Sequence, residues 1–176
     1  MPPQLTIRKE TASDIAEVYD VNRTAFDRED EANLVDALRT NSSAFIPELS
    51  IVAASENGIA GHILFTKISI HDGDGIKHDS LALAPMAVRP DLQNQGIGGR
   101  LIRHGFDVAK HLGFKSVIVL GHPDYYPRFG FEPAGQWGIK APFDVSSEAF
   151  MAIELGPGGL QHVSGTVNYP KEFSSP

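Results

Sequence analysis

The chain has 176 residues, with 22 acidic and 15 basic side chains and a formal net charge of −7. It contains no cysteine, which excludes disulfides, thiolate metal sites and a cysteine acyl-enzyme. The acidic balance disfavours nucleic-acid binding, which needs a basic face. No apolar run reaches the roughly 18 residues that span a membrane, and the N-terminus shows no signal peptide. We therefore expect one cytoplasmic domain over residues 1–176.

The N-terminal part is expected to form a short strand around Leu5 and Ile7, followed by two helices. Apolar side chains recur at helical spacing over residues 12–26, after a capping segment at residues 11–14. Asp30 is expected to cap the second helix.

The central part is rich in β-forming residues. Residues 51–55 and 59–70 flank an Asn-Gly dipeptide, which favours a hairpin. A turn at residues 71–75 then leads into a strand over 80–89.

The C-terminal half begins with an amphipathic helix over residues 96–112, which Gly113 should terminate. The apolar residues 116–120 predict a central strand, and further strands are expected at 149–155 and 164–169. With a short helix after residue 120, the chain reads as a mixed α/β (α+β) sheet of about seven strands and about four helices.

A glycine-rich segment joins the strand at 80–89 to the helix that follows. The first amides of a helix lack intrahelical partners and lie at the positive end of its dipole, so they attract anions. Glycines allow a phosphate to approach the main chain closely. The expected diphosphate-binding residues are Gln93, Asn94, Gln95, Gly96, Ile97, Gly98, Gly99 and Arg100. Neither a P-loop nor a dinucleotide-binding fingerprint fits this segment.

The pattern Gln93-x-x-Gly96-x-Gly98 resembles the pyrophosphate-binding motif of the GNAT superfamily of N-acetyltransferases, and the chain is similar to its YhbS-type subgroup. Three further segments carry the resemblance: 81–90, 119–131 and 163–170. It implies a GNAT-like fold in which the fourth and fifth strands splay apart, with the cofactor-binding part at about residues 80–131. It also implies acetyl-CoA as co-substrate and no metal.

Pro85 interrupts the strand at 80–89 because it cannot donate a ladder hydrogen bond, which predicts an edge or a bulge. In the resembled family, main-chain groups at the positions of Met86, Ala87 and Val88 hold the pantetheine arm and the thioester carbonyl. We expect the same role for these residues.

The resemblance places the general acid on Tyr126, four residues before Gly130-Phe131. A tyrosine with a pKa near 10 suits protonation of a leaving thiolate. Its neighbour Tyr125 points about 100° away if the segment is helical, so only one of them should face the sulfur.

The general base is expected to be Glu31, which lies in the region that faces the acceptor in this family. Glu29, Asp30 and His122 remain alternatives, because charges at a helix start often only complement its dipole.

Two functions stay open from the sequence. The first is direct transfer of acetyl from acetyl-CoA to a primary amine, on a small molecule or a protein, by a monomer or homodimer. The second is a non-catalytic acyl-CoA-binding or sensing module. The helix 1–2 region and residues 133–148 are expected to shape the acceptor pocket, and Trp137 covers either that pocket or a small core.

Overall fold

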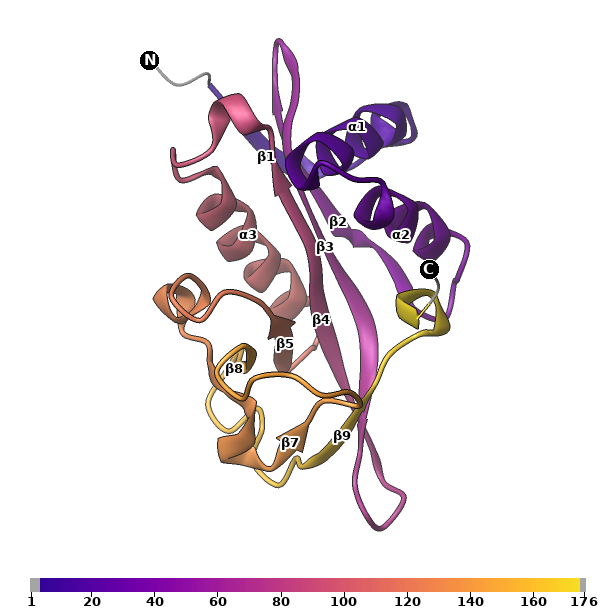
Figure 1. Cartoon of the computed structure of the whole chain (residues 1–176), viewed down its shortest axis with the longest axis vertical. Helices are drawn as coiled ribbons and strands as arrows, with labels where there is room; N and C mark the ends of the chain where they lie inside the picture. Colours follow the sequence, from indigo (N-terminus) through magenta and orange to yellow (C-terminus); the bar gives the residue numbers. More distant parts are fainter. Residues whose placement is uncertain (1–3, 175–176) are drawn as a thin grey trace.

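The computed structural model describes residues 4–174, whose strands form one nine-stranded sheet (Figure 1). The strands run in the order β1-β2-β3-β4-β5-β8-β6, and β9 pairs with both β3 and β7. The strands are β1 (Thr6–Lys9), β2 (Phe45–Ser55), β3 (Gly58–His71), β4 (Lys77–Val88), β5 (Ser116–Leu120), β6 (Glu132–Pro133), β7 (Ile139–Lys140), β8 (Phe150–Glu154) and β9 (Gly165–Asn168). The α-helices are α1 (Ile15–Phe26), α2 (Asp30–Arg39) and α3 (Ile97–His111). The expected mixed α/β sheet is confirmed.

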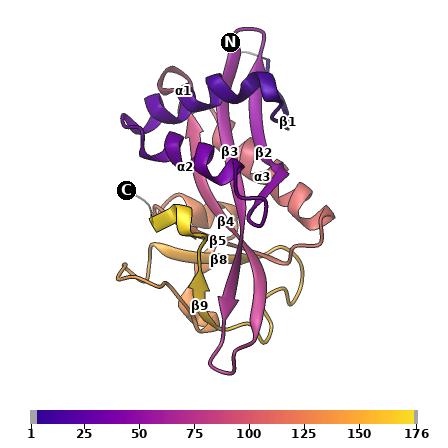
Figure 2. The ribbon, with the colours of Figure 1, turned by 90° about the vertical axis from the view of Figure 1, so that its right-hand side faces the viewer.

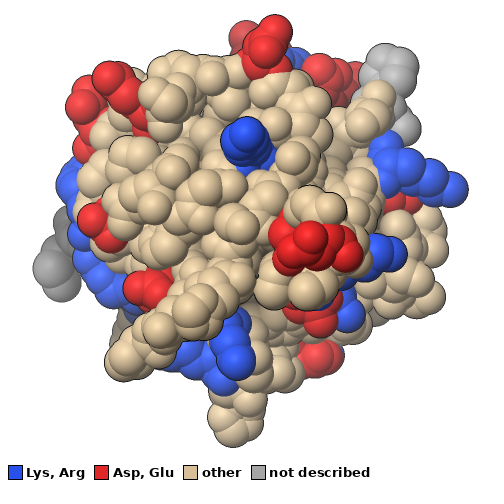
Figure 3. All heavy atoms as spheres, turned by 90° about the horizontal axis from the view of Figure 1, so that it is seen from below, with Lys and Arg blue, Asp and Glu red and all other residues tan. Residues whose placement is uncertain are grey.

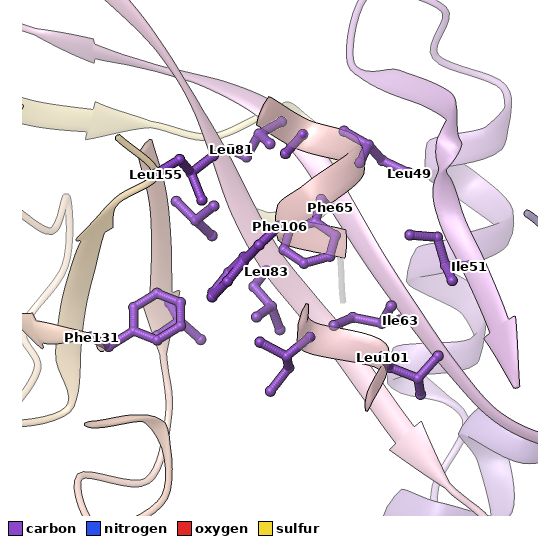
Figure 4. Packing of buried hydrophobic residues seen from close by; sticks show 14 of the residues in the cluster. Leu49, Ile51, Ile63, Phe65, Leu81, Leu83, Leu101, Phe106, Phe131 and Leu155 are labelled. Atoms are coloured by element: carbon purple, nitrogen blue, oxygen red, sulfur yellow. The ribbon is translucent and has the colours of Figure 1, made fainter. Parts of the chain in front are cut away.

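The helices cover opposite faces of the sheet (Figures 1 and 2). Side chains alternate between the faces of a strand, so Ile63 of β3 packs in the core beneath α3 while its neighbour Leu64 packs beneath α1 and α2. The larger core contains an aromatic series in which Phe106 of α3 lies 6.3 Å from Phe65 and 5.8 Å from Phe131, between ring centroids (Figure 4). This aromatic packing holds α3 against the sheet.

The element counts differ from the expectation of seven strands and four helices. The structure describes nine strands, three α-helices and several 3-10 turns. The strands β6 and β7 have two residues each, too short to show a hydrophobic period, and the expected fourth helix is the 3-10 turn η3 (Tyr126–Phe129) with Pro127 in its first turn. The strand β2 also begins six residues before the expected start at residue 51.

The structure differs from the sequence prediction in how the first two helices are capped. Asp30 does not cap α2: the N-cap is Glu29, and Asp30 is already helical, so its carboxylate sits in the first turn where it complements the dipole. The capping segment before α1 forms the 3-10 turn η1 (Ala12–Asp14), in which the Thr11 amide donates to Asp14 at 2.7 Å.

The strands β4 and β5 part soon after they meet, as the resemblance implied. They pair only at Leu81–Val117 and Ala82–Ile118. On the other side of β4, Ile63 pairs with Met86 and Phe65 with Leu83, so β4 holds one extra residue beside Pro85. The predicted bulge is confirmed, and it lies where the two strands diverge.

No helix within residues 4–174 is both long and apolar enough to cross a membrane. The end of the molecule seen from below in Figure 1 is formed mostly by residues other than Lys, Arg, Asp and Glu, with scattered charges of both signs (Figure 3).

Candidate functional site

A cleft with a volume of about 920 Å³ opens where β4 and β5 part. One wall is the β4 segment 83–88, and another is the loop and first turn of α3. The turn η3 and the end of β5 close a third side, and α1, α2 and the C-terminal turn η5 (Lys171–Ser174) each contribute side chains. The cleft thus joins segments that are far apart in the sequence.

The N-terminus of α3 presents free amides to this cleft. Its first helical hydrogen bond runs from the Arg100 amide to the Gly96 carbonyl at 3.1 Å, so the amides of the preceding residues have no intrahelical partner. Gly96 begins the helix with a left-handed φ of 84°, which glycine adopts without strain. These amides and the positive end of the dipole make an anion-binding site.

Gly98, in the first turn of α3, leaves no room for a side chain. A Cβ atom there would stand 2.7 Å from the Tyr125 hydroxyl oxygen and 3.2 Å from Met86 Cε. Two guanidinium groups also line the cleft nearby: Arg103 lies 5.2 Å from the Phe129 ring centroid and Arg128 lies 4.7 Å from that of Tyr125. The α3 side of the cleft is therefore electropositive, and a ligand there can approach the main chain closely.

The eight loop residues expected at the anion site do not all line it. Gln93, Asn94 and the segment 96–99 line the cleft, whereas Gln95 and Arg100 do not. Arg100 instead donates to the Leu5 carbonyl at 3.4 Å, and its amide is used within the helix. The role of these two residues at the anion site stays a prediction, and neither lines the cleft.

The main chain of β4 offers two residues to the gap. The Arg89 amide donates to the Ala60 carbonyl at 2.9 Å, and the register places Ala87 opposite His62. Since alternate residues of an antiparallel strand bond to the same neighbour, Ala87 faces β3, while Met86 and Val88 direct their main-chain groups to the gap. The register therefore favours Met86 and Val88 for main-chain contacts in the gap, and the role of Ala87, which lines the cleft, stays a prediction.

Gln93 holds the loop against β4. Its side-chain amide donates to the Val88 carbonyl at 3.1 Å, which uses one of the main-chain groups that face the gap. Gln93 therefore positions the loop through its side chain.

Tyr125 and Tyr126 both line the cleft, so their different directions along the chain do not show which one faces the sulfur. Their rings are perpendicular, with centroids 5.1 Å apart. Tyr126 also lies edge-on to Phe131 at 5.7 Å, and burial, with a smaller contribution from Tyr125, raises its pKa to about 12. Burial raises the pKa of Tyr125 as well, but this residue is more open to solvent. Tyr126 thus stays protonated throughout the physiological range.

Glu31 lines the cleft from α2. The Arg28 side chain donates to both of its carboxylate oxygens, with Nε 2.9 Å from Oε1, and this ion pair holds the pKa of Glu31 below its usual range. Of the alternatives, Glu29 and Asp30 do not line the cleft, whereas His122 does. Nδ1 of His122 accepts from the Asp124 amide at 3.2 Å, which leaves its proton on Nε2.

The pocket-shaping segments are only partly those expected. Phe26 and Leu34 from α1 and α2 line the cleft, but no residue of the segment 133–148 does. Trp137 packs instead in a second core with Ile139 and Leu160. Phe173 also lines the cleft, and its only sequence signal is its place just after the resembling segment 163–170.

Within residues 4–174, no group of three or more histidine, aspartate or glutamate side chains is arranged to hold a metal ion. The segment Asp72-x-Asp74-Gly75 matches only the first part of a calcium-binding loop pattern. Asp72 accepts hydrogen bonds from the amides of Asp74 and Ile76 at 2.8 and 3.0 Å. This is an Asx turn at a hairpin tip.

A splayed mixed sheet with a glycine-rich helix start in the gap is the arrangement that the resemblance to GNAT N-acetyltransferases implied. Comparison with known sequences agrees. The model of the acetyltransferase (GNAT) family matches residues 15–131. The chain belongs to this family.

Individual relatives are similar over most of the chain. YjhQ of Escherichia coli (strain K12), an uncharacterized N-acetyltransferase, is 43% identical over 137 residues, which are 77% of this chain and 75% of YjhQ. The crystal structure of Escherichia coli YhbS in complex with CoA superposes with a TM-score of 0.90 at 28% identity, covering 99% of this chain and 94% of that chain. A GNAT family acetyltransferase from Brucella melitensis in complex with acetyl-CoA gives a TM-score of 0.78 at 32% identity, covering 97% and 98%.

Proposed function

We propose that this protein transfers an acetyl group from acetyl-CoA directly to a primary amine, as one transferase domain acting on both substrates in a ternary complex. The observation that carries the proposal is the juxtaposition of the free α3 amides, the parted β4 edge and Tyr126 in one cleft. The similar structures from Escherichia coli and Brucella melitensis hold CoA and acetyl-CoA, which supports the same ligand here.

The residues present fit such a ligand. The amides that precede Arg100, together with Arg103 and Arg128, suit the charged diphosphate end. The gap-facing main-chain groups of Met86 and Val88 suit the amide-rich pantetheine arm and the thioester carbonyl.

The chemistry requires a neutral amine and a protonated leaving group. The amine nitrogen attacks the thioester carbonyl carbon, a C–N bond forms, and the C–S bond breaks with its electron pair on sulfur. The Tyr126 hydroxyl gives its proton to that sulfur, and the proton lost by the amine returns through water to the tyrosinate. The products are an amide and a thiol, so protons and charge balance.

Glu31 is the proposed acidic partner of the amine. It is ionised at neutral pH because Arg28 holds its pKa below the usual range, and beside this ion pair its oxygens keep lone pairs that can accept from the ammonium form of the amine. The ammonium loses a proton to the Glu31 carboxylate, which releases it to solvent through water, and the neutral amine remains in the cleft.

Two measurements test the proposal. Calorimetry should show CoA binding, and acetyl-CoA with a panel of primary amines should release CoA thiol. Binding without turnover on any amine would indicate the non-catalytic acyl-CoA-binding module instead. Absence of CoA binding would refute both functions.

A further inference from the structure

The part of the cleft away from α3 has an apolar wall. Beyond the α3 loop, the β4 edge and the side formed by β5 and η3, the lining comes from α1, α2 and the C-terminal turn. Its side chains are Ala25, Phe26, Leu34 and Phe173, with the Glu31 carboxylate among them. Ala25, Leu34 and Phe173 also pack against one buried core, so this wall is held from behind.

The C-terminal turn is anchored as part of this wall. The Asn41 side chain donates to Glu172 at 2.9 Å, across 131 positions of sequence. The ring of Phe173 lies 5.2 Å from that of Tyr169, which in turn stacks on Phe143 at 6.1 Å. The turn lies next to α2 (Figure 2). Phe173 is therefore a fixed surface of the cleft.

Charge divides the cleft into two ends. Among the described residues that line it, Glu31 is the only carboxylate, and Arg103 and Arg128 are the only lysine or arginine side chains. The arginines come from α3 and η3, whereas Glu31 comes from α2. Glu31 is already paired with Arg28, but its two oxygens keep lone pairs that can accept from one ammonium group. Its apolar neighbours offer no hydrogen-bond partners to other polar groups.

We propose that the acceptor is a primary monoamine whose substituent is apolar, either an aromatic ring or a branched alkyl chain, and that Phe173 determines this specificity. The inference rests on the proposed acetyl transfer and adds the substrate class. An amine rich in hydroxyl or further ammonium groups would lose water at this wall and gain no partners.

The test compares four amines by thiol release from acetyl-CoA: 2-phenylethylamine, 3-methylbutylamine, ethanolamine and spermidine. We expect kcat/KM for the two apolar amines to exceed that for the two polar ones by roughly 10-fold or more. Phe173→Ala should raise KM for 2-phenylethylamine roughly 10-fold, with kcat changed less than about 2-fold, because it removes ground-state contact. Its KM for ethanolamine should not change.

Two variants serve as controls. Phe143→Ala removes an exposed ring of the same aromatic series that does not line the cleft, and it should keep the wild-type preference. Phe173→Leu keeps an apolar wall and should retain the preference for apolar amines even if the alanine variant fails to fold.

Equal or better turnover of ethanolamine or spermidine by the wild type would overturn the substrate class while leaving acetyl transfer in place. Equal losses for all four amines in Phe173→Ala would overturn the specificity role. Absence of thiol release with every amine would overturn the proposed function itself.

Discussion

Lowering the pH should destabilise this protein through one buried histidine. His62 of β3 is fully buried beneath α1, where Nδ1 lies 3.2 Å from the Asn22 side-chain nitrogen and Nε2 lies 2.9 Å from the Ser50 hydroxyl. The Asn22 nitrogen is a donor, so it satisfies Nδ1 only while that atom is unprotonated. Burial, with a smaller contribution from the Arg39 charge, lowers the pKa of His62 to about 3.

A nearby carboxylate does not offset this shift. Glu10 Oε1 lies 4.0 Å from Nε2 of His62, but both oxygens of Glu10 accept from Arg39, at 2.8 and 2.9 Å. The negative charge is therefore already paired, and desolvation dominates the pKa of the imidazole.

The magnitude follows from linkage. His62 has a pKa of 6.5 as a free side chain and about 3 in the fold, so between these values the unfolded chain binds a proton that the folded chain does not. Stability is complete above pH 6.5 and falls as the pH decreases. At pH 5 the loss is about 2 kcal/mol, which lowers Tm by roughly 5 °C in a chain of this size.

The assay is urea unfolding at pH 7.5 and pH 5.0, followed by circular dichroism. The Asp14 carboxylate, whose pKa is lowered from 3.8 to about 2 mainly by hydrogen bonding to Arg8, loses its contribution only below pH 3.8 and adds little at pH 5.0. His62→Gln should be less stable at pH 7.5 but lose the pH difference, whereas the exposed control His111→Gln should keep it. Equal pH dependence in wild type and His62→Gln would refute the reasoning.

Three further variants test the site and the core. Tyr126→Phe should lower kcat roughly 10²-fold, because the proton donor is lost, while calorimetry shows nearly unchanged CoA affinity. Gly98→Ala should weaken CoA binding roughly 10-fold in the same calorimetric assay, since its Cβ would lie 2.7 Å from the Tyr125 hydroxyl oxygen and in the path of the phosphate. Gly105→Ala should destabilise the fold by about 1–3 kcal/mol in urea, because its Cβ would overlap the buried ring of Phe65.

Matched variants sharpen these tests. Tyr125→Phe should retain more activity than Tyr126→Phe, and the reverse order would move the general acid to Tyr125. Gly75→Ala, at an exposed hairpin tip with no atom near the added Cβ, should leave CoA affinity intact. Wild-type CoA affinity in Gly98→Ala would exclude close contact at the α3 N-terminus, and wild-type stability in Gly105→Ala would contradict the tight packing of α3 on β3.

The loop and its helix were predictable because their signals are local. A glycine such as Gly96, at a left-handed φ before an amphipathic helix, and Gly113 just after it, define the ends of α3 from short-range geometry alone. Pro85 likewise predicts the bulge, since a missing amide interrupts a ladder wherever it occurs. These features account for the confirmed fold class and for the position of the anion site.

Local signals do not predict direction or long-range contact. Gln95 and Arg100 belong to the expected segment, but neither lines the cleft, and the Arg100 side chain donates to the Leu5 carbonyl instead. Ala87 is in the right strand, but the register with β3 decides which main-chain groups reach the gap. Sequence spacing does not specify that register, because it depends on how β4 aligns with β3.

The sequence by itself determined the family, the mixed sheet and the helix start at which an anion would bind, because periodicity, glycine and proline act over a few residues. Only the tertiary structure shows which residues form the other end of the cleft. Phe173 and Glu31 both line it, although 142 positions separate them in the sequence. Contacts at such separation arise from the packing of α2 and the C-terminal turn on a common core, and no local pattern encodes that packing.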